Sequence, residues 1–318
     1  MAEADNQAPF DRALLRRRRA RAARGEASGA DYLLARTAED VIDRLAAINR
    51  QFPLALEIGA HDGLFRGVLR ASLISAKVET LIAMESIEAL ARRGGLPALV
   101  ADEEALPIAD QSLDLVVSLL SLQWTNDLPG ALIQIRRALK PDGLFLGALI
   151  GGESLTELRQ AFYEAEAEVE GGVSPRVLPF VEVRTLGALL QNAGFALPVV
   201  DLDRVTVTYA SPLALLKDLR AMGATNIIRL RSRRPLKRKT LFRAMEIYAQ
   251  RFPAKDGRIS ATFEIIHASG WAPHASQQKP LAPGSAKARL ADALGAVEQN
   301  AGEHASPTAH GPPPFGRG

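Results

Sequence analysis

The segment Leu56 to Gly63, with the sequence LEIGAHDG, holds the residues of this chain whose types and spacing most clearly indicate chemistry. An apolar run that contains Glu57 passes into a loop with glycines at positions 59 and 63, ahead of a predicted helix. In an open α/β sheet a ligand binds where such loops follow the carboxyl ends of strands, because glycine lets the backbone approach it closely. The loop is not the dinucleotide fingerprint, since His61 and Leu64 occupy the positions of its second and third glycines. A turn that needs glycine only for packing is the alternative interpretation.

Acids follow the next two apolar runs in the same manner. Glu85 ends the second run and Asp102 follows the third. A carboxylate at the first position can accept hydrogen bonds from both hydroxyls of a ribose. Asp102 can accept from the exocyclic amine of adenine, while the backbone N–H of Glu103 serves a ring nitrogen. Taken singly, each acid is typical of an exposed charge at a strand end, but their order and spacing agree with one another.

These residues must be positioned by apolar runs that alternate with helical stretches. Runs that are buried on both sides and alternate with helices predict a parallel sheet covered on both faces. The fold class we predict is therefore α/β, a doubly wound Rossmann-like sheet. The predicted strands are 54–59, 80–85, 98–102, 113–122 and 143–151, with helices ending near Ser75 and spanning Asp127 to Leu139.

The flanking regions are predicted from capping and turn signals. An arginine-rich helical arm covers Phe10 to Arg36, and Thr37 with Asp40 predicts the capping of a further helix that Pro53 ends. Ser154 with Glu157 predicts a capping box for a helix that ends near Gly171. The remaining predicted elements are a helix at 182–193, strands at 199–209 and 261–271, a helical insertion between them that begins at Ser211-Pro212, and a short helix at 285–297.

We therefore divide the chain into an arm at 1–36, a cofactor-binding core at 37–151 and a C-terminal half at 152–276. That half carries a substrate or partner insertion at about 211–260, and a largely disordered tail follows at 277–318.

Composition excludes several classes of protein. The 318 residues include no cysteine, which excludes disulfide scaffolds and thiol nucleophiles, and the five histidines lack ligand spacing, so we expect no metal site. No apolar run approaches the roughly 18 residues that span a bilayer. The start of the chain carries no hydrophobic segment of a secretory signal, so we expect a cytoplasmic protein, or a mitochondrial one if the source is eukaryotic. A net charge of +3 does not indicate nucleic acid, although arginine clusters lie at 12–24 and 229–243. We interpret these clusters as solvated helix faces or as partner-binding arms.

The loop, the acids and Lys140-Pro141-Asp142-Gly143 together resemble the class I S-adenosylmethionine-dependent methyltransferases over about 37–151. This resemblance implies a seven-stranded sheet and S-adenosyl-L-methionine as cofactor. His61 departs from the family pattern because it replaces the middle glycine. Three alternatives remain: the loop is reshaped, the histidine covers the cofactor, or the histidine faces the surface. The implied cofactor-binding residues are Glu57, Gly59, Ala60, His61, Gly63, Glu85, Ser86, Asp102 and Glu103.

A closer resemblance extends beyond the cofactor motifs. The chain is similar to the mitochondrial complex I assembly factor 5 family and its bacterial relatives, and more distantly to the methyltransferase that acts on malonyl-acyl carrier protein. The segments that carry this similarity are Phe10-Asp11-Arg12, SLQWTNDLPGAL at 121–132, RRALKPDG at 136–143, GGESL at 151–155, DLRAMG at 218–223, ATFE at 261–264 and KPL with GSAK at 279–287.

The resemblance implies an enzyme that methylates a protein or a carrier-bound acceptor, with Gln123, Trp124 and Arg220 as candidate catalytic residues. Two alternatives remain open. One is a protein arginine hydroxylase, which the mitochondrial family implies, and the other is a non-catalytic assembly factor whose partner is a complex I subunit. Methylation of nucleic acid is a weaker possibility, because no N-P-P-Y-like segment follows the fourth strand. The sequence does not indicate the oligomeric state.

Overall fold

The computed structural model covers the whole chain and describes residues 8–25, 29–278 and 295. The chain divides into two compact units, Met1–Ala275 and Ser276–Gly318. Every element and contact below belongs to the first unit. The predicted helix at 285–297 and the tail predicted from residue 277 lie almost entirely outside the described residues.

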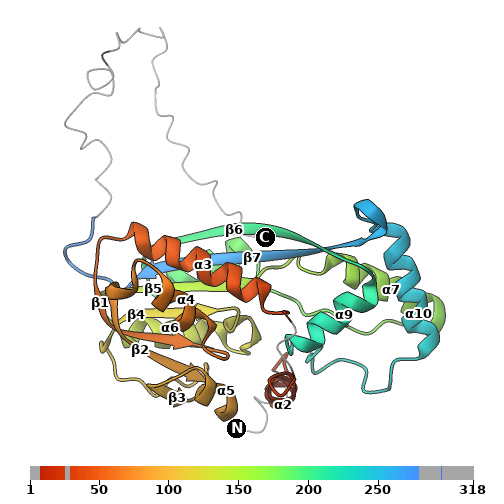
Figure 1. Cartoon of the computed structure of the whole chain (residues 1–318), viewed down its shortest axis with the longest axis horizontal. Helices are drawn as coiled ribbons and strands as arrows, with labels where there is room; N and C mark the ends of the chain where they lie inside the picture. Colours follow the sequence, from red (N-terminus) through yellow and green to blue (C-terminus); the bar gives the residue numbers. More distant parts are fainter. Residues whose placement is uncertain (1–7, 26–28, 279–294, 296–318) are drawn as a thin grey trace, which may run out of the picture. The chain divides into compact units, whose positions relative to one another are not determined.

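A seven-stranded sheet with the order β3-β2-β1-β4-β5-β7-β6 forms the centre of this unit (Figure 1). The first five strands in this order are parallel, and β7 is antiparallel to both β5 and β6. The order reverses at β1, so the carboxyl ends of β1 and β4 flank the position where an α/β sheet binds its ligand. The strand bounds are β1 Phe52–Ile58, β2 Val78–Glu85, β3 Ala98–Val100, β4 Leu113–Leu119, β5 Leu139–Ile150, β6 Ala196–Tyr209 and β7 Ile259–Trp271.

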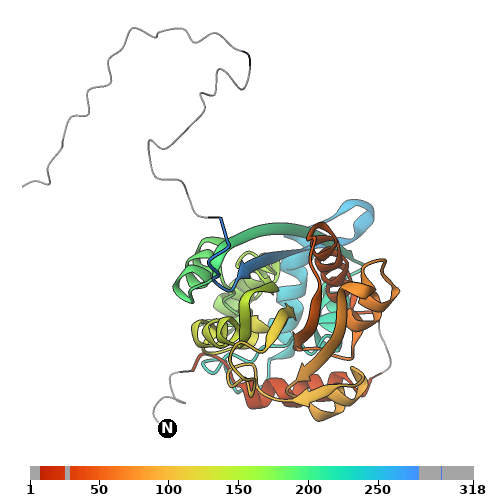
Figure 2. The same ribbon diagram turned by 90° about the vertical axis from the view of Figure 1, so that its left-hand side faces the viewer.

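Helices cover both faces of the sheet, as Figure 2 shows from the side. Consecutive strand residues point to opposite faces, so Ala55 and Leu115 join one buried cluster while Leu56 and Val116 join another. The first cluster includes residues of α3 (Tyr32–Ala47), α4 (Leu64–Ala71) and α7 (Thr156–Glu170). The second includes residues of α6 (Leu128–Ala138) and α8 (Val183–Asn192). The predicted doubly wound fold is confirmed.

The helix that we placed at Thr37 begins five residues earlier, so that prediction is wrong. Asp31 is the N-cap residue of α3, and Thr37 lies buried inside the helix, where its hydroxyl donates to the carbonyl of Leu33. The buried face simply continues toward the N-terminus through Leu33 and Leu34. Pro53 lies in β1, and α3 has already ended at Ala47.

The predicted capping box at Ser154 is also wrong. Residue Leu155 occupies the N-cap position of α7 with φ +56°, and no side chain caps the helix. Ser154 and Glu157 face strand β7 instead: the Ser154 hydroxyl donates to the carbonyl of Glu264, and the Glu157 carboxylate accepts from Thr262. The expected end of the helix at Gly171, which has φ +70°, is confirmed.

Two helices lie between the last two strands, as the sequence predicts. Helix α9 (Pro212–Ala221) begins at Ser211, whose side chain accepts from the backbone N–H of Ala214, and α10 (Arg238–Arg251) follows. Figure 1 shows α7, α9 and α10 gathered together beyond one end of the sheet. None of the helices formed by residues 8–25 and 29–278 is long and apolar enough to span a membrane.

Candidate functional site

The loop after β1 makes a close turn that only glycine fits. Gly59 has φ +72°, and a β-carbon there would overlap the hydroxyl of Ser121, which follows β4. Gly63 has φ +89° and precedes α4, and a β-carbon there would lie 2.8 Å from the Cα of Gly94. Both conformations favour glycine because a side chain is strained at positive φ. The two glycines therefore bring the loop against neighbouring segments at the carboxyl end of the sheet.

His61 is partly buried, and both of its ring nitrogens have partners. Its Nε2 is 3.1 Å from the carbonyl oxygen of Leu119, and its Nδ1 is 2.8 Å from Nη2 of Arg19. A carbonyl and a guanidinium require Nε2 to donate and Nδ1 to accept, which is the neutral tautomer. Burial and the charge of Arg19 lower the pKa of His61 to about 4. The ring is therefore uncharged near neutral pH.

Glu85 is fully buried at the end of β2 and accepts four hydrogen bonds. Its Oε1 accepts from the backbone N–H of Ser86 at 2.8 Å and from the Ser86 hydroxyl at 3.1 Å. Its Oε2 accepts from the backbone N–H of His61 and from Nη2 of Arg19, each at 3.2 Å. The structure thus brings together Glu85, Ser86 and His61, three of the predicted cofactor-binding residues.

Asp102 and Glu103 are joined through Arg12. The Arg12 guanidinium donates to both carboxylates, and its Nη1 is 3.0 Å from Oε2 of Glu104. Burial opposes its charge, but the three carboxylates outweigh burial and raise the pKa of Arg12. Glu103 also accepts from the hydroxyl of Ser121 at 3.3 Å, which links it to the loop at Gly59.

The arginine-rich arm is thus a part of the site. Helix α2 (Arg12–Ala22) buries one face, formed by Arg12, Leu15 and Arg19, which are spaced by one and two helical turns. Figures 1 and 2 both place α2 beside α5 (Glu88–Arg93), where Arg93 donates to the carbonyl of Ala23. The prediction of a solvated face or free partner arm is wrong for Arg12 and Arg19. Sequence reasoning missed both as site residues, although their seven-residue spacing would have placed them on one face.

Glu57 lies below the loop in a nearly dry environment. Its side chain is 2% exposed, and its Oε2 has no hydrogen-bond partner among the described residues. Burial raises the pKa of Glu57 to about 8, although the charge of Arg66 opposes the rise. This carboxyl is therefore mainly protonated at neutral pH, and an unpaired polar atom remains beneath the cofactor loop.

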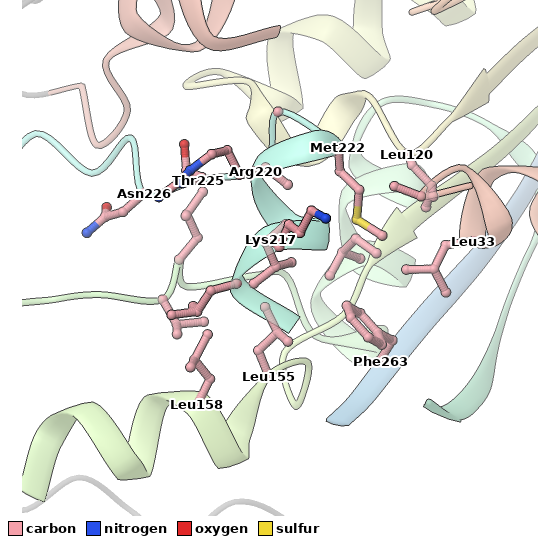
Figure 3. Close-up of a pocket in the computed structure, with 18 of the residues that line it drawn as sticks. Leu33, Leu120, Leu155, Leu158, Lys217, Arg220, Met222, Thr225, Asn226 and Phe263 are labelled. Atoms are coloured by element: carbon pink, nitrogen blue, oxygen red, sulfur yellow. The ribbon is translucent and has the colours of Figure 1, made fainter. Parts of the chain in front are cut away.

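The candidate catalytic residues Gln123 and Trp124 line a cavity that is also lined by His61 and Leu120. Both belong to the short 3-10 helix Leu122–Trp124 after β4. The Gln123 Nε2 donates to the carbonyl of Leu120 at 2.7 Å, whereas its buried Oε1 has no partner among the described residues. Arg220, in the last turn of α9, lines the same cavity, and Figure 3 shows its side chain beside that helix. The structure therefore gathers all three candidate catalytic residues around one space.

These side chains are of the types that a nucleoside cofactor needs, and in this structure arginines of α2 already bind Glu85, Asp102 and Glu103. Carboxylates stand at the carboxyl ends of β2 and β3, and the loop after β1 is shaped by glycines that no other residue replaces without strain. The unpaired Oε2 of Glu57 adds a buried polar atom below that loop. Within residues 8–25 and 29–278, no cluster of three histidine, aspartate or glutamate side chains has the geometry of a metal site.

Comparison with known proteins gives consistent results. Residues 56–147 match the methyltransferase domain family. The arginine-hydroxylase NDUFAF5 of Danio rerio is 41% identical over 286 residues, which are 89% of this chain and 88% of that protein. A malonyl-[acyl-carrier protein] O-methyltransferase of Laribacter hongkongensis is 36% identical over 262 residues, 77% of this chain and 86% of that enzyme. The YcgJ protein of Bacillus subtilis shares the fold with a TM-score of 0.50 at 15% identity, over 74% of this chain and 98% of that one.

Proposed function

The chain belongs to the complex I assembly factor 5 (NDUFAF5) family of methyltransferase-fold proteins, and we propose that it methylates an acceptor attached to a protein or a carrier. S-adenosyl-L-methionine is the cofactor, and when bound it supplies an electrophilic methyl group. The observation that carries the proposal is the juxtaposition of the cofactor loop with a cavity that reaches Gln123 and Trp124. A methyltransferase needs such a second space, because it must hold an acceptor next to its cofactor.

Positioning is the main task of the side chains in this reaction. Transfer of a methyl group from a sulfonium reduces charge separation, so most of the acceleration comes from holding the two reactants in line. Gln123 offers a buried, unpaired acceptor atom that can orient an N–H or O–H of the acceptor. Trp124, which is 8% exposed, provides a rigid apolar wall. Glu85, Ser86, Asp102 and Glu103 bind the cofactor in this proposal.

Protein arginine hydroxylation is the second candidate function. The observation that favours it is the 41% identity to proteins that are named arginine hydroxylases, over nearly the whole length of both chains. Under this hypothesis the partner is a subunit of respiratory complex I. The two candidate functions share the cofactor site. They differ in what the acceptor gains, which is a methyl group in one and an oxygen atom in the other.

Two measurements test the proposal. Isothermal titration with S-adenosylmethionine is expected to show binding by the wild-type protein and none by the Glu85→Ala and Asp102→Ala variants. Mass analysis of candidate acceptor proteins and of malonylated carrier protein is then expected to show the gain of one methyl group. A gain of one oxygen atom would support the hydroxylase instead. If both variants still complement a strain that lacks the protein, a cofactor-dependent enzyme is refuted.

A further inference from the structure

Helix α2 binds the three carboxylates that the proposed function assigns to the cofactor. Arg12 donates to Asp102 and to Glu103, and Nη2 of Arg19 is 3.2 Å from Oε2 of Glu85. The helix therefore closes the site at the carboxyl ends of both β2 and β3. A cofactor that forms hydrogen bonds with these carboxylates takes the place of the arginines, because each oxygen accepts a limited number of donors.

The same helix is attached to residues 223–228, the segment that follows α9. The backbone N–H of Asp11, which precedes α2, donates to the carbonyl of Ile227 at 2.8 Å. Gly223 lies so close to the helix that a β-carbon there would be 3.0 Å from the Cα of Arg19. No space separates α2 from this segment, so a displacement of the helix moves or detaches the segment.

Arg19 and this segment also form part of the wall of the cavity that we assign to the acceptor. The cavity has a volume of about 580 Å³, and its lining includes Arg19, Trp124, Thr225 and Asn226. Figure 3 shows Thr225 and Asn226 in the chain beyond α9. One helix therefore closes the cofactor carboxylates and part of the acceptor cavity at the same time.

Trp124 is covered by the same part of the chain. Its side chain is 8% exposed, and it belongs to a buried cluster with Phe10, just before α2, and Leu15, within α2. It also lines the cavity. Departure of α2 removes both apolar side chains from this cluster and exposes the indole ring, so the accessibility of Trp124 reports the position of the helix.

The arginines of α2 can be exchanged for a ligand at moderate cost. A buried ion pair is worth little relative to its solvated ions, because the removal of the charges from water offsets their attraction. When α2 leaves, the guanidinium groups return to water and a cofactor supplies new donors to the carboxylates, so no charge remains buried alone. In a variant that lacks the arginines, the need to hydrate the carboxylates favours the open position of the helix.

We propose that α2 is an autoinhibitory lid, which its arginine–carboxylate pairs hold closed in the free protein and which the cofactor opens by displacing them. This inference rests on the proposed function and adds an order of binding to the same site. The cofactor binds first, and the acceptor then enters the cavity that the lid has uncovered. Because both ligands bind the open state, each strengthens the binding of the other.

Quenching of tryptophan fluorescence by acrylamide measures the opening. The chain has two tryptophans, and Trp271→Phe leaves Trp124 as the reporter. We expect saturating S-adenosylmethionine to raise the quenching constant of Trp124 roughly twofold or more, because local opening admits the quencher. The matched control is Trp124→Phe, which leaves Trp271 as the reporter. Trp271 ends β7 opposite Leu144, toward the amino end of β5, and its quenching constant is expected to stay the same.

Two results of this measurement would overturn the lid. One is a quenching constant of Trp124 that falls or stays the same when the cofactor binds. The other is an equal rise for Trp271 in the control, which would show a general loosening of the fold.

Hydrogen exchange of the wild-type protein tests the lid without a substitution. Bound S-adenosylmethionine is expected to speed exchange of the amides of α2 by roughly tenfold or more, while it slows exchange in the loop 59–63. A ligand that only covers its site slows exchange in both. Slower exchange in α2 would show that the helix closes on the cofactor, and the lid as we describe it would then be refuted.

A double substitution tests whether the arginines hold the lid closed. Arg12→Met/Arg19→Met, made in the Trp271→Phe background, is expected to show the high quenching constant of Trp124 before cofactor is added and no further rise afterwards. The control Arg17→Met/Arg21→Met removes two exposed arginines of the same helix and is expected to keep the rise. A low quenching constant in Arg12→Met/Arg19→Met without cofactor would contradict the closing role of these arginines.

Titration with S-adenosylmethionine separates failure of the lid from failure of the proposed function. Binding by the wild type with no change in the quenching of Trp124 refutes the lid alone. Absence of binding by both the wild type and Arg12→Met/Arg19→Met refutes the proposed function and the lid with it. Binding that is weak in the wild type and tighter in that double variant, but not in Arg17→Met/Arg21→Met, supports both.

Discussion

Replacing Arg19 by methionine removes the one guanidinium that reaches the buried carboxylate of Glu85. The Arg19 side chain is 6% exposed and the Glu85 side chain 0%, so water cannot take over the pairing. Methionine keeps most of the aliphatic volume and therefore limits the change to the charged group. The ion pair spans 66 residues of sequence and ties α2 to the end of β2.

The expected cost follows from the environment of Glu85. Removing one partner of a buried ion pair costs about 3–5 kcal/mol, because the other charge stays uncompensated. Glu85 keeps three other donors, from the backbone of His61 and from the backbone and hydroxyl of Ser86. We therefore expect the lower end, about 3 kcal/mol, which is a shift of about 1 M in the urea midpoint for a chain of this size.

Whereas the stability of Arg19→Met is expected to fall, its affinity for the cofactor is expected to rise. The two oxygens of a carboxylate accept about four hydrogen bonds, and Glu85 already accepts four. A cofactor hydroxyl can bind Glu85 only by replacing one of these donors, and Arg19 is the charged donor on a separate helix. Its removal is expected to tighten S-adenosylmethionine binding by roughly tenfold or more, the equivalent of one charge-assisted hydrogen bond.

Urea unfolding and titration calorimetry measure both effects, with Arg17→Met as the matched control. Arg17 is exposed on the same helix, so its replacement is expected to change stability by less than about 0.5 kcal/mol. If Arg19→Met is as stable as Arg17→Met, the buried ion pair does not form. If it binds the cofactor more weakly, Arg19 contacts the cofactor and does not compete with it.

Three further predictions concern the end of β1 and the loop that follows it. Gly59→Ala is expected to lower the stability of the fold by about 2 kcal/mol and to weaken cofactor binding, because φ is +72° and the new β-carbon overlaps Ser121. In the control Gly67→Ala, inside α4, the new β-carbon meets no atom within 4 Å, so this variant is expected to gain about 0.5–1 kcal/mol of stability. Equal melting temperatures for the two variants would contradict this prediction. Burial raises the pKa of Glu57 from 4.5 to about 8, so between these two pH values Glu57 is protonated in the folded state and ionised in the unfolded state. The free energy of unfolding therefore falls as pH rises from 4.5 to 8, by up to about 1.4 kcal/mol per pH unit. Burial lowers the pKa of His61 from 6.5 to about 4, so its contribution is present above 6.5 and is lost as pH falls toward 4. The urea midpoint is measured between pH 4 and 8.5. In Glu57→Gln it is expected no longer to fall above pH 6.5, and in His61→Asn it is expected to lack the contribution that rises from pH 4 to 6.5. A wild-type pH profile in either variant would refute the assignment for that residue.

The elements that carry the cofactor motifs were predictable because their signals are local. An apolar run of strand length followed by glycine or an acid is visible within ten residues, and β1, β2 and β4 lie within three residues of their predicted positions at both ends. Helix ends that depend on one backbone conformation, such as Gly171, were also found. That the residues at these strand ends bind the cofactor stays a prediction, supported by their common edge of the sheet.

The errors arose where a local signal competed with a tertiary contact. Thr37 and Ser154 are good capping residues by type, but Thr37 lies on the buried face of a longer helix and donates to Leu33 one turn earlier, and Ser154 donates to a carbonyl of β7. The segment 12–24 contains seven arginines, of which only Arg12 and Arg19 are buried. In the sequence these two therefore look like the five that are not buried. Their carboxylate partners lie 66 to 92 residues away, beyond any local pattern.

The sequence by itself determined the sheet, its cofactor loop and the acids at the strand ends, because backbone geometry and alternating burial leave their pattern in neighbouring residues. Only the tertiary structure decided which charges meet. It turned an arginine-rich arm into a helix whose Arg12 and Arg19 occupy the predicted cofactor carboxylates. It also placed Arg19 and Trp124 around one cavity. Burial makes the arginine ion pairs strong, because an ionic group removed from water requires a partner of opposite charge. Which group becomes that partner depends on distances in the folded structure and not on spacing along the chain.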